Sequence, residues 1–551
     1  MNNIKLNKTK KYWLISLIFL VFLAGCEGFL ETPPLDVYSD GAFYTTPATA
    51  ELAVNSVYNV LISDFAVRYL EENGGPLERG ALLYPYYAEG AYKACFVGIA
   101  DANIVLKYVP DIDFGNEEVK KNRLLAEATA LRAYYYYILS VYLGPVMKIT
   151  EPLTYEEVTN IKRPEDVDEI RTFIKSELEA SIADLPSKSD TENGRVSKDF
   201  ARFVLAQEYL VEENWVEAEK YLSQIIETND YSLLPDFNDI ASYDTQGSVC
   251  NDWEYTDESI FEVSFIEGME DFDSDWFDQM TPVDCSGYQY RSERETMAKD
   301  YYQRTFLLGS SIDTYTATEN ENWVNRATGD MVNTVVGDVV NKPVFYEDPR
   351  RKSTILKYGD QMICVAQPEV YQTLTNSRYD NYAGNFLFAK YWPTSNVVYA
   401  GERGRNYLLM RYAQVLLNYA EVQYRLGHTD VAYQYLNMVR KRAWAGHIES
   451  EWKRPDSNNL YPNSNWNILV AQPLLAKGYD KFFVDLINEY FLEFTFEGKT
   501  SELMMRWGNR SDIAEAFGYQ PEQILPNRIF YGWPIEEVEE HQDNIWQNQG
   551  F

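Results

Sequence analysis

Basic residues are scarce in this chain. Lysine and arginine number 49 against 84 aspartates and glutamates, which gives a formal charge of −35 over 551 residues. Nucleic-acid binding relies on cations that displace counterions from phosphates, so this acid excess argues against a nucleic-acid partner. It argues equally against electrostatic docking on anionic lipid. With 46% hydrophobic and 24% charged residues, the chain can still bury a large core and is not disordered.

Histidine and cysteine are also rare, with three and five copies. None forms a C-x-x-C pair or a Cys/His cluster, so a zinc site is not expected. Beyond the N-terminal segment the cysteines are Cys95, Cys250, Cys285 and Cys364. The sequence favours scattered buried thiols. It leaves the disulfide state of these four cysteines open, since exported proteins form disulfides and Cys250 and Cys285 flank one loop-like region.

Long apolar runs are absent after the N-terminus. Residues 12–24 form an apolar run behind a lysine-rich start, and this run is shorter than the roughly 20 residues of a membrane-spanning helix. The run ends in L-A-G-C at Cys26, which resembles the lipobox of bacterial lipoproteins. The resemblance implies a signal peptide over residues 1–25, a lipid on Cys26 and an extended tether over 26–40. An ordinary secretory signal followed by a chance cysteine is the alternative.

Helical periodicity dominates much of the chain that follows. It predicts helices over residues 49–63, 92–108 and 127–142, the last because closely spaced alanines keep helix propensity high through a block of tyrosines. Gly144-Pro145 should end that helix. The stretch 68–91 has no such period and is expected to be irregular.

An internal repeat is the most informative pattern. Residues 205–222 read as a helix, a turn and a second helix, and the same pattern returns without gaps over residues 419–436. Ala206 and Ala218 stand at the same spacing as Ala420 and Ala432. The spacing places alanine on one helix against alanine on the next, so that the two backbones approach closely. The pattern resembles the tetratricopeptide unit.

The composition changes between residues 234 and 400. Aspartate, glycine, asparagine and aromatic residues replace the helical stripes, and residues 259–265 alternate as a strand does. So long a loop-rich insertion is usually functional. We therefore expect one domain over residues 41–551. It comprises helical repeats at about 49–233 and 401–446, a ligand-binding insertion at 234–400 and a C-terminal capping region at 447–551.

Short motifs along the mature chain extend the repeat pattern. They include Phe29, Leu30, Ile99, Asn103, Leu131, Arg132, Ala133, Trp215, Asp348, Pro349, Arg350, Arg411, Glu421, Arg440, Glu489, Glu493, Glu497, Arg506, Trp507, Asn548 and Gly550. Together they resemble the SusD/RagB family of nutrient-binding outer-membrane lipoproteins. The resemblance implies a mainly α fold, in which tetratricopeptide-like helical repeats form a scaffold with a large loop-rich insertion that carries a few short strands.

The sequence departs from the family pattern at four positions. Gln414 stands where the family usually has Glu, while Tyr490, Thr500 and Leu503 stand where its pattern has Arg, Arg and Asp. The family residues there look like a buried ion-pair network. We expect this chain to use apolar packing at these positions instead, an exchange that can be neutral for stability.

A carbohydrate ligand calls for flat aromatic platforms and directed polar groups, and the chain holds 44 tyrosines and 12 tryptophans. The family resemblance places the ligand site on loops over the repeats. Mapped here, the candidates are Tyr84, Tyr86, Tyr87, Tyr92, Trp276, Tyr288, Tyr290 and Trp323, any one of which could instead be a packed or surface ring. Carboxylates at Asp271, Asp273 and Asp275 alternate as in a calcium loop, but a solvated loop is favoured and no cofactor is expected.

The resemblance implies a non-catalytic protein that captures an oligosaccharide on the outer face of the outer membrane. Its implied partner is a TonB-dependent, SusC-like barrel, over whose mouth it closes to deliver the ligand. One alternative is a peptide-binding, RagB-like protein, and another is a scaffold that binds only proteins. A glycoside hydrolase with two carboxylates is the third, although no pair stands out among the 84 acids.

Overall fold

The computed structural model describes most of two helical regions and parts of the segment between them. The described residues are 44–62, 85–241, 254–265, 306–324, 331–357, 361–364, 367–373, 386–388, 390, 406–445, 471–495, 532–541 and 543–549, with single residues between 497 and 530. Within this part of the chain, no helix combines the length and apolar character needed to cross a membrane.

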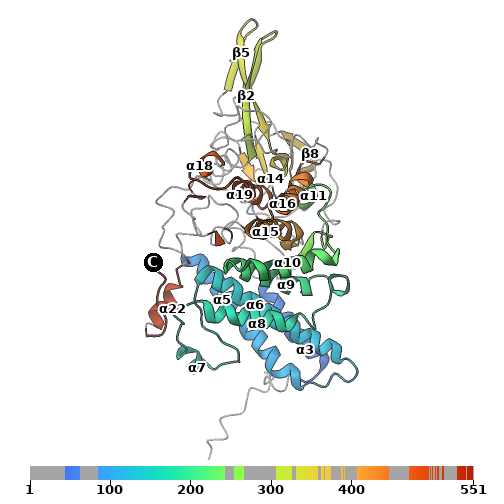
Figure 1. Ribbon diagram of the computed structural model, residues 1–551, viewed down its shortest axis with the longest axis vertical. Coiled ribbons are helices and arrows are strands. Elements are labelled where there is room, and N and C mark those ends of the chain that lie inside the picture. The colour runs from blue at the N-terminus through green and yellow to red at the C-terminus, as the bar shows by residue number, and fades with distance from the viewer. Residues whose placement is uncertain are drawn as a thin grey trace, which may run out of the picture.

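Helices build the larger, lower part of the molecule (Figure 1). The long ones are α3 (Pro47–Asn59), α5 (Pro85–Tyr108), α6 (Glu118–Leu143), α8 (Asp168–Ser181), α9 (Lys198–Val211), α10 (Trp215–Thr228), α15 (Tyr412–Arg425), α16 (Thr429–Ala443) and α19 (Lys481–Glu493). The short ones are α7 (Tyr155–Thr159), α11 (Asn238–Ala241), α14 (Arg351–Thr354), α18 (Ala471–Ala476), α22 (Ile535–Glu540) and the 3₁₀ turns η1 (Val60–Ile62), η2 (Val109–Asp111) and η3 (Lys188–Asp190). The mainly helical fold class is confirmed.

Each long helix packs on its neighbours in the order α3, α5, α6, α8, α9, α10, α15, α16 and α19. Helix α10 ends at Thr228 and α15 begins only at Tyr412, yet α15 packs on α10 as the next member of the stack. The scaffold is therefore continuous in space although the insertion interrupts it in sequence. Such stacking buries one core along the whole series of helix pairs.

The repeated alanines lie where the sequence pattern predicts them. Ala206 on α9, Ala218 on α10, Ala420 on α15 and Ala432 on α16 are all fully buried. Helix α9 packs on α10 and α15 packs on α16. A methyl side chain at these positions leaves room for the two backbones of each pair to approach, so the tetratricopeptide-like reading is confirmed.

Helix α6 is buried over most of its length, including all four tyrosines at residues 134–137. The Tyr135 hydroxyl donates to the Val57 carbonyl at 2.6 Å, and the Tyr136 hydroxyl donates to the Ile149 carbonyl at 2.9 Å. A Cβ at Gly98 on α5 would lie 2.4 Å from the Tyr135 ring, so glycine permits this close contact. Part of the tyrosine excess thus belongs to the core and not to a binding surface.

Helix α6 ends at Leu143, as Gly144-Pro145 predicts. Gly144 adopts φ +76°, and a Cβ there would lie 2.6 Å from the Phe530 ring. The C-terminal segment closes over this end, where Asn548 Nδ2 donates to the Leu143 carbonyl at 2.9 Å. Arg163 donates to the Pro145 carbonyl at 2.8 Å and also to the Asn548 side chain. Burial lowers the pKa of the Arg163 guanidinium to about 10.

Several sequence boundaries need correction. Helix α6, expected over residues 127–142, begins at Glu118. The helix expected to begin at residue 92 begins at Pro85, so residues 85–91 are helical and not irregular. Proline is well suited to the first helical position, because its φ is fixed and its missing N–H has no helical partner there. Near residue 401, where repeats were expected to resume, residues 407–411 form a strand and the helix begins at Tyr412.

The strands form two-stranded antiparallel pairs. Strand β1 (Ser259–Val263) pairs with β10 (Tyr407–Arg411), β2 (Leu307–Thr316) with β5 (Val339–Glu347), β3 (Glu321–Val324) with β4 (Met331–Thr334), β6 (Ile355–Lys357) with β9 (Phe386–Phe388), and β7 (Gln361–Cys364) with β8 (Gln367–Thr373). The β1 assignment confirms the strand expected at 259–265. The β2–β5 pair projects from the end of the molecule opposite α3 and α7 (Figure 1).

Candidate functional site

Strands β1 and β10, which lie on the two sides of the long insertion in sequence, pair with each other beside the scaffold. Asn406, the residue before β10, links the two sides of this strand pair. Its side-chain oxygen accepts from the Phe265 backbone N–H at 3.1 Å, and its Nδ2 donates to Glu262 Oε2 at 3.1 Å. Glu262 Oε1 also accepts from the Tyr255 N–H at 2.8 Å. Burial raises the pKa of the Glu262 carboxyl, and the hydrogen bond from Asn406 opposes this. These bonds fix both ends of the chain segment that carries four of the eight predicted ligand residues.

A buried ionic network lies where the insertion meets helices α16 and α19. Its hydrogen-bonded members are five basic side chains, Arg350, Lys390, Arg411, Arg440 and Arg442, and five acidic ones, Glu258, Asp348, Glu489, Glu493 and Glu497. Asp485 lies beside them, 3.9 Å from Arg440 Nη2. All ten are buried. Removing a charge from water is costly unless the charge is paired and hydrogen-bonded. Each of the ten forms an ion pair with at least one side chain of opposite sign, which meets this requirement.

Arg411, the last residue of β10, is the centre of this ionic network. Its Nε donates to Glu497 Oε2 at 2.7 Å. Its Nη1 donates to Glu258 Oε1 at 2.9 Å and to Glu493 Oε1 at 2.6 Å. One guanidinium therefore joins the residue before β1, helix α19 and the segment after α19.

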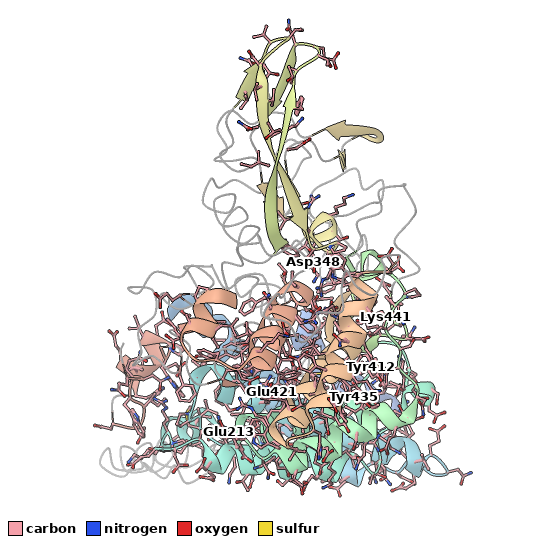
Figure 2. All side chains as sticks on the ribbon, turned by 45° about the horizontal axis from the view of Figure 1, so that its top comes forward. Glu213, Asp348, Tyr412, Glu421, Tyr435 and Lys441 are labelled. Carbon is pink, nitrogen blue, oxygen red and sulfur yellow. The ribbon has the colours of Figure 1, made fainter. Side chains whose placement is uncertain are left out.

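Arg350 links Asp348, which lies at the foot of the β2–β5 pair (Figure 2), to the scaffold. Asp348 accepts from Arg350 Nε at 2.8 Å and from Nη2 at 2.9 Å. The remaining guanidinium nitrogen, Nη1, donates to Glu489 Oε1 at 2.7 Å and to Glu493 Oε2 at 3.0 Å on α19. The two hydrogen bonds to Asp348 orient the Arg350 guanidinium so that its Nη1 points toward the two carboxylates of α19.

The ionic network shifts the pKa values of its members. Burial would raise the pKa of the Glu493 carboxyl, but Arg442, Arg411 and Arg350 together lower it to about 2. Burial lowers the pKa of the Lys390 ammonium to about 8, against the attraction of Glu497. Glu493 is therefore ionised at any pH near neutrality.

The expected apolar packing at the departures from the family pattern is found at two of the four positions. Tyr490 and Leu503 are buried. The Tyr490 ring packs edge-on against Trp507 with centroids 5.6 Å apart, and its hydroxyl donates to Asn418. Gln414 is buried in α15. Thr500 lies outside the described residues.

The second buried polar cluster joins three scaffold helices through family-pattern residues. Arg132 on α6 donates to Asn103 Oδ1 on α5 at 2.7 Å and to Glu177 Oε2 on α8 at 2.9 Å. Asn103 Nδ2 in turn donates to the Ile149 carbonyl at 3.0 Å. These hydrogen bonds link α5, α6 and α8 within the scaffold.

The structure tests little of the predicted ligand site. Tyr84, Trp276, Tyr288 and Tyr290 lie outside the described residues, as do Cys26, the alternating carboxylates Asp271, Asp273 and Asp275, and the signal and tether segments. Tyr86 and Tyr87 lie on α5 and Trp323 on β3, but their side chains are not described. Their roles stay predictions.

Tyr92 is the one ligand candidate whose side chain is described. It is buried, with its ring 5.4 Å from the Trp533 ring and 4.8 Å from the Phe96 ring. Burial, together with nearby Glu537, raises the pKa of its hydroxyl. Tyr92 thus packs α5 against the C-terminal segment. A part in ligand binding would require these contacts to open.

No group of side chains suited to hold a metal ion occurs among the described residues.

The sequence predicted only part of the ionic network. The i, i+4 spacing of Glu489 and Glu493 places two carboxylates on one face of α19, with Glu497 just after the helix, and the family pattern suggested ion pairs there. Nothing local to Arg350, Lys390 or Arg411 showed that they meet these carboxylates, because they come from distant parts of the chain.

The chain belongs to the SusD family, whose sequence profile matches residues 257–549. A second profile, described as "Starch-binding associating with outer membrane", matches residues 50–210. The first match runs from just before β1 through the rest of the insertion and helices α15, α16 and α19. The second covers most of α3 and continues through nearly all of α9.

Individual relatives agree over most of the chain. "SusD-like protein P25" from Formosa agariphila is 24% identical over 498 residues, which are 83% of this chain and 87% of the relative. Among solved structures, a SusD-like protein from Bacteroides fragilis superposes with a TM-score of 0.65 at 17% identity, covering 94% of this chain and all of that one. Surface glycan-binding protein A from Bacteroides thetaiotaomicron, in complex with laminarihexaose, gives 0.57 at 18% identity, covering 92% and all of that chain. At such identities the structures show the shared fold.

Proposed function

We propose that this protein binds an oligosaccharide at the cell surface without cleaving it and passes it to a TonB-dependent, SusC-like transporter. The observation that carries the proposal is the mounting of the insertion on the scaffold. Half of the predicted aromatic candidates (Trp276, Tyr288, Tyr290 and Trp323) belong to a segment that leaves and rejoins the helices at the β1–β10 pair. The ten charges of the ionic network hold this junction, so a site there would be largely preformed.

Three further observations support the proposal. Relatives with this fold include a laminarin-binding SusD-like protein and a surface glycan-binding protein in complex with laminarihexaose. One matching profile is described by starch binding and association with the outer membrane. The L-A-G-C sequence at Cys26 fits a lipid anchor on that membrane, with the body facing outward.

Calorimetry with neutral oligosaccharides tests the ligand class. Trp276→Ala with Tyr288→Ala should weaken binding at least tenfold, because stacking rings and buried hydrogen bonds supply most sugar affinity, with each ring contributing on the order of 1 kcal/mol. The melting temperature should hardly change. A matched control replaces Val216 and Met438, two exposed residues on scaffold helices α10 and α16, by alanine, and it should bind like the parent.

The controls also separate the alternatives. Equal affinity in the Trp276/Tyr288 variant and the control would remove these rings from the site. Binding of peptides but of no glycan would favour the RagB-like alternative. Release of reducing ends from a bound glycan would reveal a hydrolase.

Membrane attachment is tested separately. Cys26→Ser should move the protein from the membrane fraction to the soluble fraction, since the lipid would be its only anchor. Fractionation and acyl labelling measure this, and continued labelling of the Cys26→Ser variant would disprove the anchor. Co-purification of the parent with a large barrel protein in mild detergent would support the transporter partner.

A further inference from the structure

The C-terminal segment folds back onto the first helices of the scaffold. We call residues 532–541 and 543–549 the C-terminal strap. Its helix α22 lies beside α5 (Figure 1), and Lys93 Nζ on α5 lies 3.9 Å from Glu536 Oε2 on α22. Asn548, near the end of the strap, is one of the family-pattern residues, and the proposed function assigns it no part. The strap therefore brings a motif from the end of the chain to the first helices.

One side chain joins the two ends of the strap. Gln547 Oε1 accepts from the Trp533 N–H at 2.6 Å, and Gln547 Nε2 donates to the Trp533 carbonyl at 3.0 Å. The Asn548 N–H donates to the same Gln547 oxygen at 2.8 Å. A side-chain amide that bonds both backbone groups of one residue fixes where that residue lies. Residues 533–547 are therefore closed into a loop that contains α22.

Leu143, the last residue of α6, is the point where the strap is attached. Its carbonyl accepts from Asn548 Nδ2 at 2.9 Å, from Trp533 Nε1 at 3.3 Å and from Arg163 Nη2 at 3.4 Å. The last carbonyls of a helix have no partner within that helix, and here two strap side chains supply one. The strap therefore caps α6.

Arg163 fastens the strap to this end of α6. Its guanidinium lies 4.5 Å from the Trp533 ring and 5.4 Å from the Trp546 ring, and it donates to the Trp546 carbonyl and to the Asn548 side chain. Its acceptors are four oxygens without formal charge, and among the described residues no carboxylate pairs with it. Its charge lies instead at the C-terminal end of α6, where the helix dipole is negative.

The strap also covers the start of α5. Among the described side chains of this helix, burial begins at Ala91 and Tyr92. The Tyr92 ring packs against the Trp533 ring, with centroids 5.4 Å apart. Residues 85–91 lack the apolar period of the rest of α5, so their helical conformation depends on tertiary contacts. The first large buried side chain described on α5 therefore packs on the strap.

We propose that the C-terminal strap is a positioning element of the oligosaccharide site: it holds the first turns of α5 in the conformation that binds ligand. Tyr86 and Tyr87, two of the predicted ligand residues, lie on α5 just before Tyr92. Rings that are held in place before binding lose less freedom when a sugar stacks on them. The strap residues and Arg163 act through α5 and do not contact the ligand themselves. This inference rests on the proposed function.

Amide hydrogen exchange and calorimetry on the full chain test the proposal together. Gln547→Ala with Asn548→Ala opens the loop of the strap and removes one donor from the end of α6. Exchange in residues 85–96 should become about tenfold faster through local opening, while exchange in α10 stays as in the parent. Affinity for an oligosaccharide that the parent binds should fall several-fold. Glu539→Ala, at an exposed position of the same strap, is the matched control and should change neither quantity.

Added ligand separates positioning from stability. Because ligand and strap hold the same turns of α5, saturating oligosaccharide should restore slow exchange in residues 85–96 of the double variant. Trp276→Ala with Tyr288→Ala should lose affinity without faster exchange in these residues. Asn548→Ala alone keeps the side-chain bonds between Gln547 and Trp533. It should show smaller effects in the same direction, and it replaces the double variant where that variant unfolds.

Failure of this inference and failure of the proposed function give different results. Unchanged exchange in residues 85–96 of a folded double variant would overturn the inference, and so would faster exchange with unchanged affinity. In both cases binding by the parent leaves the proposed function intact. A parent that binds no oligosaccharide overturns the proposed function, and the inference fails with it.

Discussion

In the helical scaffold, neighbouring elements are brought together by small and apolar side chains, whereas at the junction with the insertion they are brought together by charges. Ala420 and Ala432 let two scaffold helices approach by having almost no side chain. Arg411 joins three segments because its guanidinium donates to three carboxylates. Apolar packing is tolerant of small changes, but a balanced charge set depends on every member. The two regions should therefore respond differently to mutation and to pH.

The largest effect should come from removing the central charge. Arg411→Met leaves Glu258, Glu493 and Glu497 short of one cation, and breaking a buried ion pair on one side costs about 3–5 kcal/mol. Urea unfolding at pH 7 measures the loss of unfolding free energy. At pH 4 the difference from the parent should shrink, since a carboxylate left unpaired takes up a proton. A loss below about 1 kcal/mol would mean that the ionic network is not structural.

The second-largest effect should come from acid, which should weaken the junction between the scaffold and the insertion. The pKa of Glu493 is depressed from 4.5 to about 2 in the folded protein. Its contribution is therefore fully present above pH 4.5 and is lost as the pH falls toward 2, on the order of 3 kcal/mol in total at 1.36 kcal/mol per pKa unit. Guanidinium unfolding between pH 6 and 3 would show the decline.

A matched variant isolates this group. Glu493→Gln should be less stable than the parent at neutral pH and should lose less stability on acidification, because it has no proton to bind at that position. Parallel pH profiles for the two proteins would contradict the assignment of the acid sensitivity to Glu493.

The smallest of the three effects should occur in the scaffold. Ala420→Leu forces extra volume between helices that meet at an alanine, and overpacking of this kind costs about 1–3 kcal/mol. Because no charge is involved, the loss should be the same at pH 7 and pH 4. Val216→Leu on exposed α10 surface is the control and should leave the unfolding midpoint unchanged. If the loss of unfolding free energy in Ala420→Leu depended on pH, it would contradict the proposed difference between the two regions.

The scaffold was largely predictable from the sequence, for a local reason. The alanine spacing of the first repeat, its return at Ala420 and Ala432, and the Gly144-Pro145 stop each act within one or two neighbouring helices. The wrong predictions concerned where individual helices and strands begin. The helix starting at Pro85 extends into a stretch with weak periodicity, and the strand before Tyr412 pairs with β1, which lies on the far side of the insertion in sequence.

The candidate site was less predictable. The number of tyrosines indicated binding surfaces, but the tyrosines of α6 and Tyr92 are buried. A ring with one hydroxyl can fill a core when a nearby oxygen accepts its proton, as the Val57 and Ile149 carbonyls do for Tyr135 and Tyr136. A ring's sequence position does not reveal whether such a carbonyl lies nearby. The ligand itself depends on side chains whose neighbours come from loops with no sequence period.

What the sequence by itself determined is the helical, alanine-paired repeat, the acidic charge and the family, since these depend on periodicity, composition and short motifs. Only the tertiary structure decided that α15 stacks on α10 across the insertion and that Arg350, Lys390 and Arg411 neutralise the carboxylates beneath it. These features join residues far apart in the chain, and their energy depends on three-dimensional distance and burial, which no local pattern encodes.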